Sequence, residues 1–316
     1  MKKNIYFAMA IVATALFAAC SSEDDAVTRV EEPQGITIIA NLPQDGITRV
    51  AYEETTSGSN YGVKETWETG DKLRCTYWQS GEGTQRSENN DVNYETGAVK
   101  IQKNPADNAY VYLSYPIGLS TPTVADAAGT TATWSSLDQS NYVYADINAL
   151  KTGGKNLLVG SFQYTGSTTQ TVTLQNVYAL LKFSVKVPTT AASIKNIKIG
   201  KLNGDQNKRA TITNKATDIV MTGTTISYSG TANGAIDSPS SATYTLTGDG
   251  TYKEATFYAL VIPQKFDKGL YLELKDANNV TYTYMKPTGK SGQAADQTLE
   301  AGKMYGIKAV LTAPSE

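Results

Sequence analysis

Short segments of alternating apolar and polar residues recur along this chain, and they constrain its fold more than any other feature. Examples are "DKLRCTYW" at 71–78, "AYVYLSYP" at 109–116, "ATFYALVIPQ" at 255–264 and "NVTYTYMK" at 279–286. A period of two residues, interrupted by Gly, Asn, Asp or Pro, is typical of β-strands. Helical spacing is scarce, and only a helical turn or two is expected within 138–152. The pattern therefore predicts an all-β protein.

Turn residues indicate how the predicted strands connect. Asp276–Asn279 and Gly248–Gly250 are expected to close hairpins. Two polar stretches, 121–134 and 229–242, are expected to be surface loops.

The spacing of strands and turns favours β-sandwiches over alternating strand–helix units. The chain has 316 residues, which is enough for about two domains. The polar break "TGSTTQT" at 165–171 is the predicted boundary. It would separate an N-terminal β-sandwich domain at 27–166 from a C-terminal one at 167–316.

The N-terminus has the organisation of an export signal. Lys2 and Lys3 precede an apolar run at 5–17, which is too short to span a membrane. Small residues and Cys20 follow, an arrangement that resembles the lipobox of bacterial lipoproteins. The expectation is a signal peptide at 1–19, cleavage before Cys20 and lipidation of its thiol. An ordinary signal peptide followed by an unrelated cysteine is the alternative.

Residues 20–34 are predicted to form an acidic tether. The run "SSEDD" at 21–25 resembles the surface-export signal of Bacteroidetes lipoproteins, and a purely solvating tether is the alternative. The resulting expectation is a surface-exposed lipoprotein of the outer membrane, held there by its lipid anchor.

Composition argues against catalysis and against nucleic-acid binding. Histidine is absent, so Ser-His-Asp and Cys-His sites and imidazole metal ligation are excluded. A two-carboxylate hydrolase would need a suitably placed acidic pair, and no recognisable motif contains one. The formal net charge of −2 shows no basic excess. We expect no enzyme, no cofactor and no nucleic-acid partner.

A possible calcium loop and the aromatic residues have simpler explanations. The stretch "DVNYETG" at 91–97 resembles a calcium loop, but its Gly comes one position late and the later Glu is missing. A turn is the better interpretation, and no metal is expected. Tyrosines of two strand-like runs could form a ligand platform, but half-buried sheet packing is the preferred interpretation. They are Tyr110, Tyr112, Tyr115, Tyr282 and Tyr284. Cys75 is expected to be a buried small hydrophobe.

Four motifs occur in a characteristic order. They are "TWETGDKLR" at 66–74, "NVYALLKFSV" at 176–185, "FYALVIPQ" at 257–264 and "LEAGKMYGIKAVL" at 299–311. In this order, behind a lipobox, they resemble the fimbrillin family of Bacteroidetes, which are subunits of type V pili. The match spans nearly the whole mature chain.

The resemblance implies a fold, a route to the cell surface and a mode of assembly. It implies two transthyretin-like β-sandwich domains in tandem, and delivery to the cell surface as a lipoprotein. An arginine-specific or trypsin-like protease would then remove an N-terminal segment that includes the first strand. Assembly with other pilus subunits would follow by strand donation into the vacated groove. Stalk, tip and anchor subunits all fit this resemblance.

The residues make physical sense of such a removable strand at about 36–42. Ile36, Ile38, Ala40 and Leu42 alternate on one face of the run "ITIIANL". A turn follows, and it is expected to expose Arg49 and Val50 to a protease. The triplet Thr-Arg-Val recurs at Arg29 and Val30, where a cut would leave the strand attached. Arg49 is therefore the preferred site, with a plain loop arginine as its alternative.

The last predicted strand has a similar pattern. Tyr305, Ile307, Ala309 and Leu311 alternate on one face, so this segment could be the donated strand. The preferred interpretation is that it is the final core strand of the second domain. The alternative to a pilus subunit is a monomeric surface lipoprotein, or a tip adhesin, whose loops bind a glycan or a protein on a host or bacterial surface.

Overall fold

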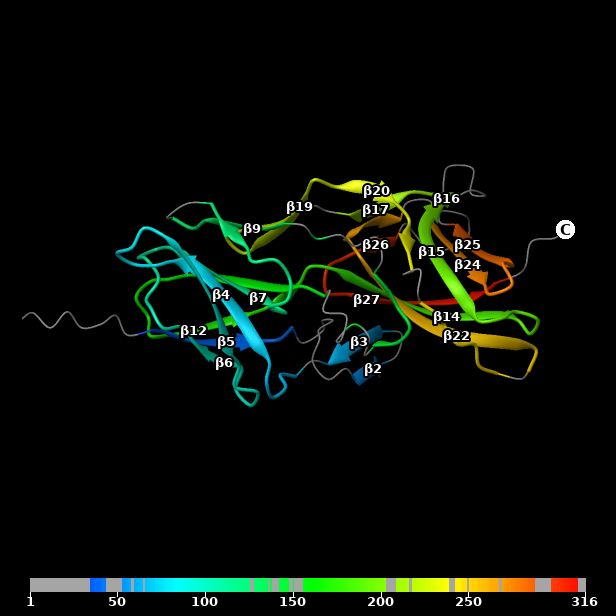
Figure 1. Cartoon of the computed structure of the whole chain (residues 1–316), viewed down its shortest axis with the longest axis horizontal. Coiled ribbons are helices and arrows are strands. Elements are labelled where there is room, and N and C mark those ends of the chain that lie inside the picture. The colour runs from blue at the N-terminus through cyan, green and yellow to red at the C-terminus, as the bar shows by residue number, and fades with distance from the viewer. Residues whose placement is uncertain are drawn as a thin grey trace, which may run out of the picture. The chain divides into compact units, whose positions relative to one another are not determined.

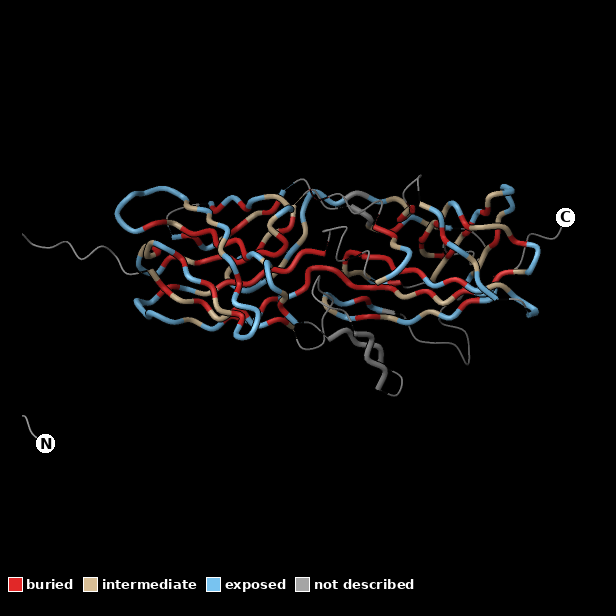
Figure 2. The backbone as a smooth tube through the Cα atoms, turned by 60° about the horizontal axis from the view of Figure 1, so that its bottom comes forward, coloured by how far each residue is buried: buried red, intermediate tan, exposed pale blue. Residues whose placement is uncertain are grey.

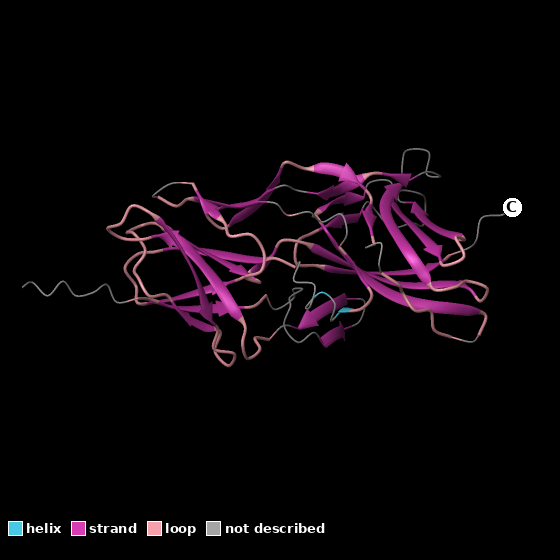
Figure 3. Cartoon of the chain, in the orientation of Figure 1, coloured by secondary structure: helices cyan, strands magenta, loops and turns pink. Residues whose placement is uncertain are grey.

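The computed structural model of the chain confirms an all-β fold, and nearly every regular element in it is a strand (Figure 3). It describes residues 35–43, 53–57, 60–64, 66–125, 128–135, 137, 142–147, 150, 156–202, 209–215, 218–238, 242–248, 250–266, 269–287 and 297–311. Ile147 and Leu150 are helical, within the range where a helical turn was expected.

Two sheets enclose the first hydrophobic cluster. One has the order β12-β1-β6 and the other the order β13-β11-β7-β4-β5 (Figure 1). Their strands are β1 (Thr37–Asn41), β4 (Lys72–Trp78), β5 (Gln85–Asp91), β6 (Ala98–Lys100), β7 (Tyr110–Tyr115), β11 (Leu158–Gln163), β12 (Thr169–Thr173) and β13 (Gln175–Asn176). Side chains from both sheets, including Ile38 of β1 and Leu113 of β7, form one buried cluster. The two sheets therefore form a sandwich.

Two further sheets enclose a second cluster. They have the orders β10-β22-β14-β27-β3-β2 and β16-β15-β24-β25, with β21 paired to β15. Their strands are β2 (Glu53–Ser57), β3 (Asn60–Lys64), β10 (Val143–Tyr144), β14 (Ala179–Pro188), β15 (Ile194–Leu202), β16 (Arg209–Ala210), β21 (Ile236–Asp237), β22 (Tyr252–Val261), β24 (Gly269–Asp276), β25 (Thr281–Pro287) and β27 (Met304–Val310). Phe183 of β14 stacks on Phe257 of β22 with ring centroids 4.8 Å apart in this core.

A third cluster joins strands from both halves of the chain. It contains Trp134, Tyr112 from β7, Leu180 from β14 and Ile219. The sheet β19-β18-β9-β8 contributes to it, and two small sheets pair β17 with β20 and β23 with β26. These strands are β8 (Thr123–Val124), β9 (Thr131–Ser135), β17 (Ile212–Lys215), β18 (Asp218–Thr222), β19 (Thr225–Ser229), β20 (Ala232–Gly234), β23 (Gln264–Phe266) and β26 (Gln297–Leu299).

Alternating burial along the strands explains why the sequence period predicts them. In β14, Leu181, Phe183, Val185 and Val187 are buried, while the intervening Lys182, Ser184 and Lys186 are half-buried or exposed. Figure 2 shows buried residues, in red, along the inner runs of the backbone and exposed ones, in pale blue, at the outer bends.

The hairpin expected at Asp276–Asn279 is confirmed, since β24 and β25 pair in antiparallel fashion across it. The buried Asp276 carboxylate accepts hydrogen bonds from the backbone N–H groups of Ala192 (3.0 Å), Asn278 (2.9 Å) and Val280 (2.8 Å). Asn279 has a φ of 67°, which the turn requires. An aspartate that satisfies three backbone donors fixes the turn locally.

The prediction that 121–134 and 229–242 are surface loops is wrong in part. The range 121–134 contains β8 and most of β9, and Trp134 is fully buried. The range 229–242 contains β20 and β21, and Ile236 is fully buried. Their Gly, Ser and Thr content suggested loops, yet each range pairs with a strand far away in sequence: β9 with β18, and β21 with β15.

Residues Pro33–Glu316 form one compact unit by their backbone contacts. The predicted boundary at 165–171 falls at the start of β12, which pairs with β1. The tandem arrangement of domains 27–166 and 167–316 stays a prediction. The predicted signal peptide and the acidic tether lie outside the described residues.

Candidate functional site

Strand β1 occupies the middle of its three-stranded sheet. It pairs in parallel with β12 over five residues, from Thr37 opposite Thr169 to Asn41 opposite Thr173. On its other side it pairs in antiparallel fashion with β6, with Ile38 opposite Val99. Neither neighbour is adjacent to β1 in sequence, so its two flanks come from distant parts of the chain.

The inward face of β1 is completely buried. Ile36, Ile38, Ala40 and Leu42 are 1%, 0%, 0% and 6% exposed, and all four belong to the same hydrophobic cluster. The alternate residue Asn41 is exposed. The side chains therefore lie as the alternation in the sequence predicts, and they contact the opposite sheet through residues such as Leu73 and Val111.

Backbone hydrogen bonds hold β1 at both ends and on both sides. Towards β12, the N–H of Thr37 donates to the carbonyl of Thr168 at 2.9 Å, and the N–H of Leu174 donates to the carbonyl of Asn41 at 2.8 Å. Towards β6, the N–H of Ile101 donates to the carbonyl of Ile36 at 3.1 Å. Without β1, groups on both neighbouring segments would lose their partners.

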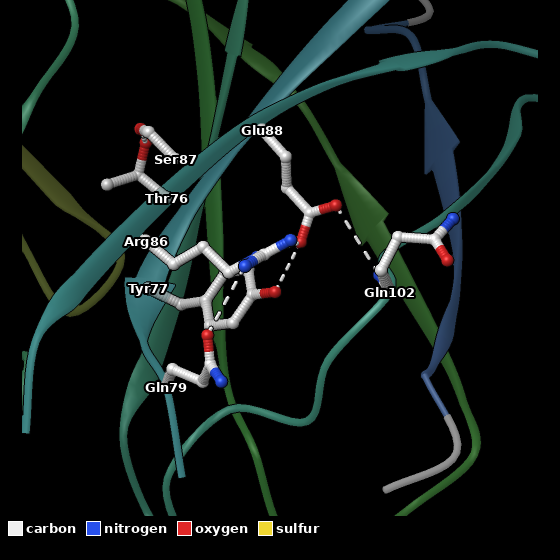
Figure 4. A network of polar contacts seen from close by, with 7 residues as sticks. All are labelled: Thr76, Tyr77, Gln79, Arg86, Ser87, Glu88 and Gln102. Carbon is white, nitrogen blue, oxygen red and sulfur yellow. Dashed lines mark hydrogen bonds and ion pairs between the residues drawn. The ribbon is translucent and has the colours of Figure 1, made fainter. Parts of the chain in front are cut away.

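A polar network supports the β6 side of this site. Figure 4 shows the Glu88 carboxylate of β5 between Tyr77 and Gln102. It accepts hydrogen bonds from the Tyr77 hydroxyl, from Nε of Arg86 at 3.0 Å and from the backbone N–H of Gln102 at 3.4 Å. Burial, followed by the hydrogen bond to Glu88, raises the pKa of Tyr77, so this tyrosine stays a neutral donor. The Glu88 carboxylate thus ties the chain after β6, at Gln102, to the opposite sheet.

Trp67 also contacts β1, and the sequence reasoning did not assign it this contact. Its indole N–H donates a buried hydrogen bond to the carbonyl of Ala40 at 2.8 Å, across 27 residues of sequence. Its ring meets that of Tyr115 edge-on, with centroids 5.3 Å apart. In the sequence, Trp67 stands out only as part of the "TWETGDKLR" motif. A sequence pattern gives the face of a strand but not the side chain that reaches its backbone.

The last strand, β27, has a different environment. It pairs in parallel with β14 over seven residues, from Met304 to Val310. On its other side, the described strands provide one pair, Met304 with Tyr61 of β3. Ala309 and Leu311 are buried, but Tyr305 and Ile307 are only partly buried. In this structure β27 is paired with β14 of the same chain, and its other side is largely unpaired among the described strands.

The residues predicted for lipidation and for proteolysis lie outside the described residues. They are Cys20, Arg29, Val30, Arg49 and Val50. The expectations for them remain predictions.

The tyrosines considered as a ligand platform pack into the interior instead. Tyr112, Tyr115 and Tyr282 are at most 3% exposed, and Tyr110 and Tyr284 are half-buried. Cys75 is fully buried, and burial raises the pKa of its thiol to about 12, which keeps it protonated and unreactive. Within the part of the chain that the structure describes, no cluster of His, Cys, Asp and Glu could hold a metal ion. No helix in that part is long and apolar enough to cross a membrane.

Solved structures with a similar arrangement include adhesion and fimbrial proteins. A candidate cell adhesion protein from Bacteroides ovatus is 13% identical, with a TM-score of 0.49 and coverage of 90% of this chain and 96% of its own. A candidate cell adhesion protein from Bacteroides uniformis is 15% identical, with a TM-score of 0.45 and coverage of 89% and 98%.

The tip fimbrial protein Mfa3 from Porphyromonas gingivalis, with a C-terminal truncation, is 10% identical, with a TM-score of 0.36 and coverage of 87% and 94%. No protein-family model matches the chain, and no curated protein matches it. All three TM-scores are below 0.5.

Proposed function

We propose that this protein is a structural subunit of a cell-surface pilus that supports adhesion. It is exported as a lipoprotein through Cys20, processed after Arg49 by an arginine-specific or trypsin-like protease, and assembled by strand exchange with other subunits. After processing it belongs to the fimbrium.

The central position of β1 carries this proposal. A strand at the edge of a sheet can leave without opening the sheet, whereas a strand hydrogen-bonded on both sides leaves a slot when it goes. The slot between β6 and β12 would expose the surface that now covers Ile36, Ile38 and Leu42. Burying each of these three side chains contributes about 1.5–3 kcal/mol. An open slot of this kind is therefore a strong acceptor for another strand.

The order of residues along the chain supports Arg49 as the processing site. Arg49 follows Leu42, the buried residue directly after β1, so a cut there separates the whole strand covalently from the rest of the protein. A cut at Arg29 precedes β1 and would only release the protein from its lipid. The two arginines therefore predict different products.

The preferred role of β27 stays that of a final core strand, and as a donated strand it would first have to leave its pairing with β14. Its pattern nevertheless matches that of the β1 segment. In β1 the buried face reads Ile38, Ala40, Leu42, and in the last strand Ile307, Ala309 and Leu311 have the same order and spacing. Both strands also have a parallel partner. After β1 has left, strand β27 of a neighbouring copy could therefore fill the groove with the same three side-chain types, isoleucine, alanine and leucine.

The decisive experiment compares Arg49→Ala with Arg29→Ala in the native bacterium. The N-terminus of the protein in isolated pili is determined, together with the amount of SDS-resistant polymer. We expect pilus protein that begins at Val50, loss of polymer in Arg49→Ala, and normal polymer in Arg29→Ala. Purified protein treated with trypsin should also form SDS-resistant ladders.

The opposite result favours a monomeric surface lipoprotein or tip adhesin. Native protein that begins at Cys20, with unchanged polymers in Arg49→Ala, would remove the strand-exchange function.

A further inference from the structure

We infer that Trp67 is a positioning residue that, together with Gly97, sets the register of whichever strand fills the β1 groove, and that the buried place of Ala40 in that register admits only a small side chain. The inference rests on the proposed exchange of β1. It concerns the contacts that the groove makes with its strand, whatever the strand's origin.

The ladder between β1 and β6 ends at Ala40. Its N–H donates to the carbonyl of Gly97 at 2.9 Å. Strand β6 begins at Ala98, and Gly97 belongs to the turn before it. The carbonyl of Ala40 is instead satisfied by the Trp67 indole N–H. The indole thus takes the place of a backbone donor at the end of the ladder, where an unsatisfied buried carbonyl would be costly.

Gly97 lets this carbonyl approach closely. A Cβ at position 97 would lie 2.5 Å from the carbonyl oxygen of Ala40 and 3.0 Å from the indole nitrogen of Trp67. Gly97 also has a φ of +69°, a backbone conformation that favours glycine. Trp67 and Gly97 therefore define one narrow place for a strand carbonyl.

The "TWETGD" motif holds the indole in position. Tyr115 packs edge-on against Trp67, and its hydroxyl donates to Oδ1 of Asp71 at 2.7 Å. Oδ2 of the same Asp71 accepts from the backbone N–H of Glu68, next to Trp67, at 2.8 Å. Gly70 has a φ of +93°, which the turn between them requires. The motif thus builds a rigid donor that faces the groove.

A strand shifted by one residue would turn its apolar face outwards. A shift of two residues keeps a carbonyl near the indole, but it places a side chain as large as Ile38 or Leu42 where Ala40 is fully buried. Such overpacking is destabilising. The carbonyl contact and the small side chain together leave one favourable register.

The test uses the three tryptophans of the chain as reporters. The indole nitrogens of the full chain are labelled with ¹⁵N, and Trp67→Phe assigns the Trp67 signal. After cleavage, mass spectrometry follows release of the segment that ends at Arg49. We expect the Trp67 indole signal to shift and its proton to exchange faster upon release, while those of Trp78 and Trp134 change little. A synthetic peptide of residues 35–43 should restore the original signal.

Peptide affinity then measures the selectivity. On the cleaved wild-type protein, the same peptide with Ala40→Leu should bind at least about tenfold more weakly, a measurement that needs no protein variant. Trp67→Phe should weaken the unmodified peptide by about tenfold. Trp78→Phe is the matched control, because the Trp78 indole nitrogen has no hydrogen-bond partner among the described residues.

The possible failures are distinguishable. If the segment stays bound after cleavage, strand exchange itself fails, and the role of Trp67 fails with it. If the segment leaves but the Trp67 signal does not respond, or both peptides bind equally well, the role of Trp67 is overturned while strand exchange stands.

Discussion

Strands β1 and β27 have nearly the same alternation of apolar residues but occupy different positions in their sheets. β1 has hydrogen-bonded strands on both sides, and all four of its inward side chains are buried. Among the described strands β27 has one long partner, β14, and Tyr305 and Ile307 on its inward face are only partly buried. The pattern of a strand thus determines which face is apolar, and its neighbours determine how much stability that face contributes.

The largest expected difference comes from truncating the matched isoleucines. Ile38→Ala removes a fully buried side chain from β1 and should lower the free energy of unfolding by about 2–5 kcal/mol. Ile307→Ala acts on a partly buried side chain and should cost about 1 kcal/mol. Urea unfolding of the two variants measures both. Equal losses would mean that the two strands contribute alike.

A pH-dependent difference should distinguish the two sandwiches. Burial alone would raise the pKa of Asp276, but hydrogen bonds from Ala192, Val280, Asn278 and Tyr282 outweigh it and lower the pKa below its ordinary 3.8. The stabilisation is thus complete above about pH 3.8 and is lost as the pH falls through the folded-state pKa.

At neutral pH, Asp276→Ala should cost about 3 kcal/mol, because it leaves buried backbone donors unpaired. The cost should shrink below pH 3.8. Regional hydrogen exchange should show the change in β24 and β25 and not around β1. A cost that is the same at pH 7 and pH 3 would contradict this role of the carboxylate.

The matched alanines should differ by a smaller amount. Ala40→Val adds volume to a fully buried position and should cost about 1–3 kcal/mol. Ala309→Val should cost less than Ala40→Val, because β27 pairs along its length with only one of the described strands and can adjust. Thermal unfolding of both variants checks the order, and a reversed order would show that the groove around β1 has spare room.

The smallest effect is expected from a surface ion pair between β4 and β5 of the first sandwich. Lys72 and Asp91 form an ion pair at 2.8 Å, but their side chains are 45% and 80% exposed. Lys72→Ala should therefore change the free energy of unfolding by less than about 0.5 kcal/mol. A larger loss in urea unfolding would mean that charge, as well as apolar burial, stabilises the first sandwich.

Local patterns predicted the all-β fold, the inward face of β1 and the hairpin at Asp276–Asn279. These features depend on a period of two residues or on turn chemistry within a few residues. The parallel pairing of β1 with β12 was not predicted, because alternation does not identify a neighbour more than a hundred residues away. Trp134 lies in the range expected to be a loop, but β9 pairs along five residues with distant β18 and along two with β8.

At the candidate site, the sequence indicated the four side chains of β1 but not the groups that receive them. Trp67 was recognised within a motif, yet its hydrogen bond to Ala40 depends on two segments that meet only in the folded protein. The local sequence around Trp67 does not indicate this contact, because a tryptophan next to a turn is equally consistent with simple packing.

The placement of β1 between β6 and β12 also sets a folding order. β1 is synthesised first, but Thr37 pairs with Lys100 on one side and with Thr169 on the other. Contacts between residues so far apart in sequence form slowly, because a long loop must close first. During synthesis, the chain must extend beyond β12 before β1 has both neighbours. Until then, the backbone groups of β1 that face β12 have no strand partner.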